Sequence, residues 1–171
     1  MAPQTKHKGI FSILDKKILK NRLKYYFLKV VPRGVEVSLE LTNNLKYRLR
    51  GRSADKTVFK EIWLNKLYDQ YGVKIEKGDT VVDIGAHVGI FSTYAAEQSQ
   101  TGKIFSFEPF VENYKRLQFH KKVNNKDQIV PFNYGISEMQ AQKFCISIPK
   151  TQAEIRCLKA KTKKKKWKLK R

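Results

Sequence analysis

Short apolar segments alternate with helical segments in the second half of the chain, and this alternation constrains the fold more than any other feature. Helices are expected at 90–97 and 111–123, where the chain follows a rhythm of strand, loop and helix after residue 79. Strands are expected at 80–84, 103–107 and 129–134, with a further candidate at 144–148. Strands that alternate with helices form parallel sheets. The pattern predicts a Rossmann-like α/β fold.

The first part of the chain predicts a helix and a β-hairpin. Apolar residues recur at helical spacing in 10–31, which indicates a helix that packs on the domain or a basic amphipathic helix on an anionic membrane surface. Alternating apolar residues at 35–39 and 45–49 predict a hairpin that covers one edge of the main domain. Asp55 is expected to cap a helix that runs to about Tyr71.

Charge divides the chain into a balanced body and two basic ends. The net charge is +21, yet acidic and basic residues nearly balance between 34 and 155. We therefore predict a basic amphipathic segment at 1–33, a single α/β domain at 34–155 and a lysine-rich disordered tail at 156–171. The ends are expected to make weak, non-specific contacts with nucleic acid or an anionic membrane, because no basic face is built into the body.

Apolar content and cysteine usage narrow the class of protein. The longest apolar run, 25–31, is far shorter than the roughly 18 residues that span a bilayer, and no secretory leader pattern is visible. Cys145 and Cys157 form no CxxC pair, so we expect ordinary thiols and no metal site. These features predict a cytoplasmic protein, with peripheral attachment to a membrane as the alternative.

A glycine-containing loop, Asp83-Ile84-Gly85-Ala86-His87-Val88-Gly89, follows the first predicted strand of the sheet. Such loops at the carboxyl edge of a parallel sheet bind nucleotide-like ligands, because glycine lets a ligand approach the backbone. The GxxxG spacing differs from the GxGxxG of dinucleotide sites, and the carboxylate of Asp83 would repel a pyrophosphate. S-adenosylmethionine, which has an ammonium and a sulfonium group but no phosphate, suits this loop better.

Glu108 ends the second predicted strand, where an acid accepts hydrogen bonds from both hydroxyls of a ribose. The alternatives are structural, with Asp83 capping the following turn and Glu108 a solvated strand end. His87 is counted among the cofactor-binding candidates, and it is either a base or an ordinary loop residue. His120, late in its helix, is expected on the surface.

Four segments resemble the FkbM-type methyltransferases: LRGRSADKTVFKEIW, GDTVVDIGAHVGIFSTYAA, GKIFSFEPFVENYKRLQFHKKVNN and IVPFNYGIS. The resemblance covers roughly residues 45–140. It implies the class I methyltransferase fold, S-adenosylmethionine as cofactor and, usually, O-methylation of a sugar, glycan or secondary metabolite. It also implies roles for single residues. The loop on the methionine side would comprise Asp83, Gly85, Ala86 and Gly89, with Glu108 on the ribose and Phe110 near the adenine.

The chain departs from this family after about residue 150. The family's domain continues with more strands and a Lys-Ile-Asp-x-Glu-Gly segment, whereas a lysine-rich stretch follows here. The change of composition predicts an incomplete parallel sheet, a truncated or frameshifted reading frame, and an inactive chain.

Three functions are compatible with the sequence. The first is an S-adenosylmethionine-dependent methyltransferase with a small-molecule or glycan acceptor and an unidentified catalytic base. The second is a nucleic-acid-binding protein or RNA methyltransferase that uses the basic ends, although aromatic residues for base stacking are sparse near the tail. The third, an NAD-type oxidoreductase half-domain, is disfavoured by the loop spacing. Arg50, Arg52 and Asp55 either reach the cofactor or acceptor or form a salt-bridged surface.

Overall fold

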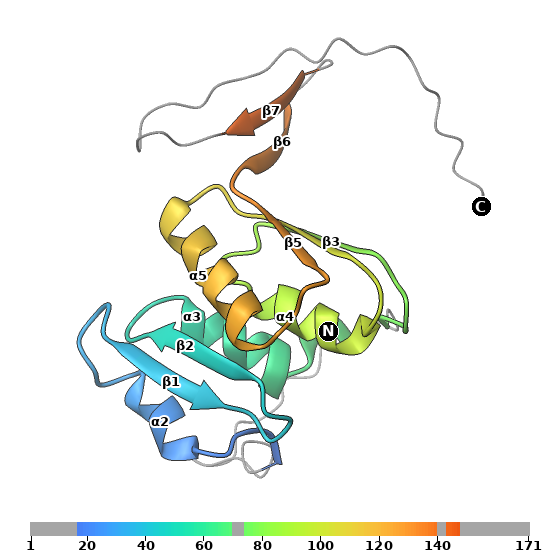
Figure 1. Cartoon of the computed structure of the whole chain (residues 1–171). Coiled ribbons are helices and arrows are strands. Elements are labelled where there is room, and N and C mark those ends of the chain that lie inside the picture. The colour runs from blue at the N-terminus through green and yellow to red at the C-terminus, as the bar shows by residue number, and fades with distance from the viewer. Residues whose placement is uncertain (1–16, 70–73, 140–142, 148–171) are drawn as a thin grey trace, which may run out of the picture.

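The structure, a computed structural model, describes residues 17–69, 74–139 and 143–147 (Figure 1). The helices are α2 (Arg22–Phe27), α3 (Asp55–Phe59), the π-helix η1 (Lys60–Leu64), the 3₁₀-helix η2 (Leu67–Asp69), α4 (Ile90–Ser99) and α5 (Val111–Val123). The strands are β1 (Glu36–Glu40), β2 (Lys46–Arg50), β3 (Val81–Ile84), β4 (Ile104–Phe107), β5 (Ile129–Phe132), β6 (Gly135–Met139) and β7 (Lys143–Ser147).

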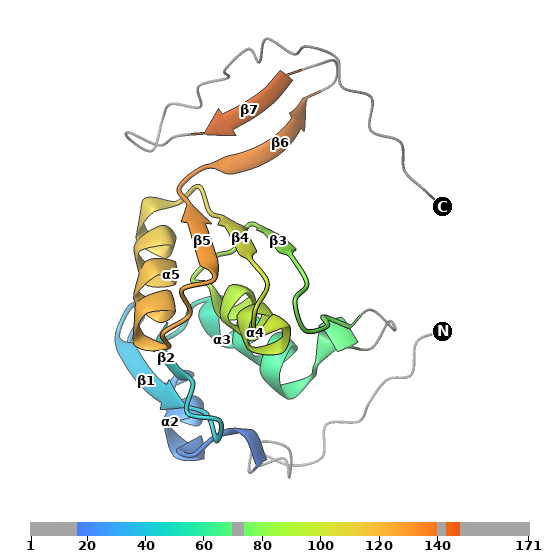
Figure 2. The same ribbon diagram turned by 45° about the vertical axis from the view of Figure 1, so that its right-hand side comes forward.

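The centre of the fold is a three-stranded parallel sheet in the order β3-β4-β5. Helices α4 and α5, which connect these strands, cover the same face of the sheet (Figure 2). Buried Ile104 and Ile129 form this face together with Ala95, Ala96 and Leu117 from the helices. This arrangement confirms the predicted Rossmann-like α/β fold. The residues of α5 are those predicted, and the three strands agree with their expected positions to within two residues at each end.

The other face of the sheet is open among the described residues. Val82 and Ile84 of the outer strand β3 are 56% and 61% exposed. Phe107 and Phe132 stack beside them with ring centroids 4.9 Å apart. These side chains form an apolar surface on the face of the sheet opposite α4 and α5. The predicted strand near 144–148 is observed as β7, but it pairs antiparallel with β6 and is not a member of the parallel sheet.

Helix α4 separates the sheet from the antiparallel hairpin β1-β2. Leu39, Tyr47 and Leu49 of the hairpin share a core with Ile90 and Tyr94 of α4. The prediction of a hairpin is confirmed, but the expectation that it covers an edge of the domain is wrong. The hairpin packs on the helical layer, because the apolar face of the hairpin meets the side of the helices that points away from the sheet (Figures 1 and 2).

Side chains of α5, of its C-cap residue Asn124 and of α3 bind the free edge of β2. The N–H groups of Lys46 and Arg48 donate to Asn124 Oδ1 at 2.7 Å and His120 Nε2 at 2.9 Å. The N–H group of Arg50 donates to an oxygen of Asp55 at 2.9 Å. His120 is fully buried, so its prediction as a surface residue is wrong. An unpaired strand edge needs partners, and these side chains supply them.

Two helices differ from the sequence-based expectations. Ser53 Oγ, rather than Asp55, accepts the first N–H bond at the start of α3, and the helix continues as the π-helix only to Leu64. The Asp55 side chain is turned to Arg50 instead of capping its own helix. The expected helix at 10–31 is interrupted, because Leu19 forms a β-bridge with Leu41 before α2 begins. Tyr71, Cys157, residues 1–16 and the tail predicted to be disordered lie outside the described residues.

No helix within the described ranges is long and apolar enough to cross a membrane.

Candidate cofactor site

The loop between β3 and α4 contains three residues with positive φ: Gly85 (+78°), His87 (+53°) and Gly89 (+82°). A Cβ atom at Gly85 would meet no other atom within 4 Å, so bare backbone faces open space at this position. A Cβ atom at Gly89 would lie 2.9 Å from Leu117 Cγ. Gly85 therefore permits close approach of a ligand, and Gly89 permits close packing of α5 against the loop.

Three N–H groups of this loop already have partners within the protein. Gly85 and Ala86 both donate to the carbonyl oxygen of Phe107, at 2.9 and 3.0 Å. His87 donates to the carboxylate of Glu108 at 2.8 Å. The Ala86 methyl group is itself buried in the core under the sheet. Phosphate-binding loops present several free N–H groups to their ligand, and this loop is built differently.

Glu108 organises the carboxyl edge of the sheet. Its two oxygens accept the N–H groups of His87 and Phe110 at 2.8 and 2.9 Å, and the residue is only 3% exposed. The alternative that Glu108 is a solvated strand end is therefore wrong. Each carboxylate oxygen can accept a second hydrogen bond, which leaves acceptor capacity for a ligand. The Phe110 ring, by contrast, is exposed at the start of α5.

Asp83 lies on the helix-facing side of β3 and is 8% exposed. Ser92 Oγ donates to its carboxylate at 2.5 Å, and Ser106 Oγ donates in turn to Ser92 at 2.9 Å. Asp83 thus binds α4 instead of capping the turn that follows it. Burial raises the pKa of Asp83 to about 6, the negative charge of Glu108 adds to the rise, and the bond from Ser92 opposes it.

Because the pKa of Asp83 is raised, the effect of Asp83→Asn on the stability of the protein should depend on pH. The native protein holds the Asp83 proton more tightly than the unfolded chain, whose ordinary pKa is 3.8. The protonated Asp83 side chain therefore contributes to the free energy of unfolding below about pH 4, and this contribution is lost as the pH rises through about 6. We expect Asp83→Asn to stabilise the protein by about 1–3 kcal/mol at pH 7.5 and to have little effect at pH 4.

Urea denaturation at the two pH values measures this difference. Ser99→Ala, at another buried hydroxyl of α4, serves as the control without a charge. Equal effects of Asp83→Asn at both pH values would contradict the prediction.

A buried ion pair joins the hairpin to the loop. Asp55 is completely buried, and the Arg50 side chain donates to it from Nε at 3.0 Å and Nη2 at 2.7 Å. Burial alone would raise the pKa of Asp55, but the bonds from Arg50 outweigh it and the pKa is lowered. His87 Nε2 lies 3.4 Å from Arg50 Nη2 and 3.6 Å from Asp55 Oδ1. The same Nη2 donates to Asn113 of α5 at 2.9 Å.

Arg50 and Asp55 therefore form a buried pair that lies beside the loop. Arg52, by contrast, is exposed and donates to the backbone carbonyl of Val30. Sequence reasoning missed three polar residues of this region: Ser92, Ser106 and Asn113. Ser106 carried a usable signal, because it alternates with Phe105 and Phe107 and so shares the inner face with Ile104. Asn113 carried none, since only the packing of α5 brings it to Arg50.

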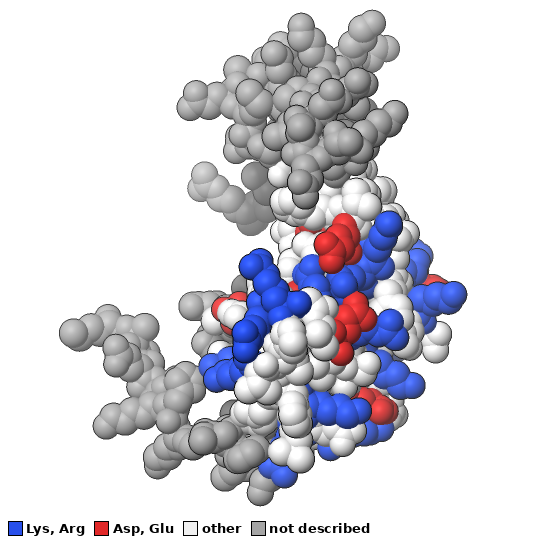
Figure 3. Space-filling view, turned by 90° about the vertical axis from the view of Figure 1, so that its left-hand side faces the viewer, with Lys and Arg blue, Asp and Glu red and all other residues white. Residues whose placement is uncertain are grey.

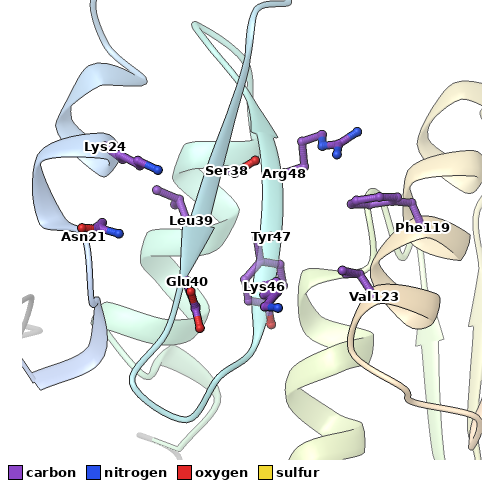
Figure 4. A pocket seen from close by; sticks show the side chains of 10 residues that line it. All are labelled: Asn21, Lys24, Ser38, Leu39, Glu40, Lys46, Tyr47, Arg48, Phe119 and Val123. Carbon is purple, nitrogen blue, oxygen red and sulfur yellow. The ribbon is translucent and has the colours of Figure 1, made fainter.

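Two surface pockets of about 240 Å³ each lie away from the loop. One lies between α2, the hairpin and the C-terminal half of α5, with Lys24, Lys46, Arg48 and Phe119 in its lining (Figure 4). The other is formed by the hairpin turn, η1 and α4. Neither of these two pockets is lined by residues 85–89. Gly85 and Phe110 are themselves exposed.

No protein-family model matches the chain. It is 26% identical over 99 residues to the AMB antimetabolite synthetase AmbE of Pseudomonas aeruginosa, a match that covers 57% of this chain. It is 33% identical over 52 residues to the 31-O-demethyl-FK506 methyltransferase FkbM of Streptomyces tacrolimicus. That match covers 30% of this chain. The chain spans only 5% and 20% of the lengths of these two curated relatives.

Among solved structures, the chain is similar to M. jannaschii TYW2 in complex with AdoMet, with a TM-score of 0.43 and 21% identity. That alignment covers 60% of this chain and 44% of the other. A SAM-dependent O-methyltransferase from Thermotoga maritima aligns with a TM-score of 0.40 and 17% identity, over 65% of this chain and 44% of the other. The FkbM relative belongs to the group whose motifs this sequence resembles.

Proposed function

We propose that this chain binds S-adenosylmethionine at the carboxyl edge of its sheet and serves methyl transfer. The observation that carries the proposal is the set of polar groups at the carboxyl edge of the sheet. Two buried carboxylates, Asp83 and Glu108, flank a glycine loop whose N–H groups at Gly85, Ala86 and His87 are already bonded within the protein. Such an edge attracts a cationic ligand and offers little to a pyrophosphate.

The residues present fit this cofactor. The negative charge of Asp83 complements an ammonium group, and Glu108 has acceptor capacity for ribose hydroxyls. Gly85 leaves room for close approach, and the exposed ring of Phe110 offers an apolar surface for an adenine. When bound, S-adenosylmethionine supplies an electrophilic methyl group. The contribution of this chain is to orient that group, since methyl transfer depends mainly on positioning.

We further propose that the acceptor is an oxygen of a small molecule, sugar or glycan, by similarity to the FkbM relative, which is a methyltransferase. The face of the molecule in Figure 3 gives no separate support for a polyanionic acceptor. Lys and Arg side chains on the hairpin and α5 side of the molecule are interspersed with Asp and Glu rather than gathered into one patch (Figure 3). We therefore do not propose that this face binds nucleic acid.

Titration calorimetry tests the choice of cofactor. We expect S-adenosylhomocysteine, which keeps the amino acid, ribose and adenine, to bind the wild-type chain, and NAD to give no heat of binding. Asp79→Asn, an exposed carboxylate at the opposite end of β3, is the control and should bind as wild type does. Binding of NAD without binding of S-adenosylhomocysteine would reverse the assignment.

A further inference from the structure

The pocket between α2, the hairpin and the C-terminal half of α5 gathers more basic than acidic side chains (Figure 4). Its volume is about 240 Å³, and its charged lining residues are Lys24, Lys46, Arg48 and Glu40. The pocket is separate from the cofactor loop. Helix α5 begins at the carboxyl edge of the sheet with Val111, and Phe119 of the pocket lies about 12 Å further along the helix.

Glu40 does not neutralise the lysines around it. Its Oε1 atom accepts a hydrogen bond from Lys20 Nζ at 2.8 Å. This bond lowers the pKa of Glu40, although desolvation opposes the effect. The charges of Lys20, Lys46 and Lys24 lower this pKa further, so three ammonium groups lie near one carboxylate. The ammonium groups of Lys24 and Lys46 have no hydrogen-bond or ion-pair partner among the described residues.

Arg48 adds a third positive charge to the pocket, beside an aromatic ring. Its Nε atom lies 3.4 Å from Glu36 Oε2, and its guanidinium carbon lies 4.4 Å from the centre of the Phe119 ring. Glu36 also pairs with Arg116, so one carboxylate is shared between two guanidinium groups. The positive charge of Arg48 is therefore only partly balanced within the protein.

The rest of the chain holds little negative charge that could balance this pocket. Outside the ranges that the structure describes, the acidic residues of the sequence are Asp15 and Glu154 alone, whereas lysines are frequent there. Attraction between opposite charges therefore favours an external anion as the partner of Lys24 and Lys46.

The pocket also has an apolar wall. Phe119 and Val123 are four residues apart on α5, so they lie on the same side of that helix, and both are half-buried lining residues. Leu39 contributes from the hairpin. Figure 4 shows Phe119 and Val123 on the α5 side of the hairpin and Lys24 on the α2 side. A ligand that uses both sides has a charged group and a short apolar or ring-shaped part.

We propose that this pocket binds a small phosphomonoester, whose phosphate group pairs with Lys24 and Lys46 and whose organic part contacts Phe119 and Val123. A phosphomonoester carries about two negative charges at pH 7, which balance two ammonium groups, and lysine binds phosphate as a point charge. The volume lies below the roughly 300–1,000 Å³ of pockets for drug-sized ligands, so a single ring with its phosphate is the expected size. This binding requires neither S-adenosylmethionine nor methyl transfer.

Titration calorimetry of the full chain with phenyl phosphate, inorganic phosphate and phenol tests the proposal. Salt at about 150 mM screens weak contacts with the basic ends of the chain. We expect phenyl phosphate to bind, and inorganic phosphate to bind at least about threefold more weakly, because it lacks the apolar contact. Phenol, which lacks the charge, should give no heat of binding.

Variants of the lining residues locate the site. Lys24→Gln and Lys46→Gln keep a long polar side chain without its charge, and each should weaken phenyl phosphate binding about fivefold. Lys103→Gln, at an exposed lysine just before β4, is the matched control and should bind as wild type does. Phe119→Leu should weaken phenyl phosphate about threefold and leave inorganic phosphate unchanged. Urea denaturation checks that each variant is folded.

The contrary outcomes are distinct. A folded wild-type chain that binds no phenyl phosphate overturns the proposal. Full affinity in both Lys24→Gln and Lys46→Gln, or an equal loss in Lys103→Gln, shows that phosphate binds elsewhere through general charge and overturns it as well. Equal affinity for phenyl phosphate and inorganic phosphate overturns the assignment of an organic part. None of these results bears on S-adenosylhomocysteine, whose binding is measured separately.

Discussion

The Glu108→Ala variant is expected to bind S-adenosylhomocysteine at least tenfold more weakly than wild type and to be about 2–4 kcal/mol less stable. The loss of affinity follows from the charge-assisted hydrogen bonds that the carboxylate would form with the ribose, worth about 1.5–3 kcal/mol. The loss of stability has a separate cause, since the N–H groups of His87 and Phe110 would lose their acceptors. Calorimetry and urea denaturation measure the two effects independently.

Two further variants separate these effects. Glu108→Gln keeps one acceptor oxygen for the loop but removes the charge, so its stability should lie between those of wild type and the alanine variant. Glu76→Ala, an exposed acid before β3, should change neither quantity. A dissociation constant that stays at the wild-type value in folded Glu108→Gln and Glu108→Ala would show that Glu108 only organises the loop.

The second large effect is expected for His120→Leu, which should lower the free energy of unfolding by about 2–5 kcal/mol. The Nδ1 atom of His120 donates to the carbonyl of Val88 at 2.6 Å, and Nε2 accepts the N–H group of Arg48 at 2.9 Å. Leucine satisfies neither backbone group. The loop and the free edge of β2 would each keep an unpaired buried atom, and urea denaturation measures the cost.

The pH dependence of stability provides an independent check on His120. Burial lowers the pKa of His120, so the folded protein resists protonation of a ring that the unfolded chain accepts near its ordinary pKa of 6.5. The stability from the neutral ring is present above about pH 6.5 and is lost as the pH falls through the lowered value. His120→Leu should show a smaller decline on acidification. Gln118→Leu, on the exposed side of the same helix, should change stability by less than about 0.5 kcal/mol, and a similar loss there would contradict the assignment.

Sequence by itself determined the α/β core. Apolar strands such as 81–84 and 104–107 are short, β-branched or aromatic, and separated by segments of helical length, so local propensity and burial favour the same structure. Gly85 was also readable from the sequence, because glycine adopts a positive φ without steric cost and leaves the backbone accessible to a ligand. The position of Glu108 at the next strand end followed from the parallel register, which places the two strand ends at one edge.

Only the tertiary structure decided which polar residues are buried together. His120 has the sequence environment of an exposed helical residue, and it is buried because the edge of β2 lies against α5 and needs an acceptor there. Asp55 has the position of a helix cap, yet Arg50 binds it more strongly, with three hydrogen bonds. Contacts of this kind join residues whose separation in sequence carries no periodic signal, so periodicity cannot reveal them. They depend instead on how the hairpin, the helices and the loop pack.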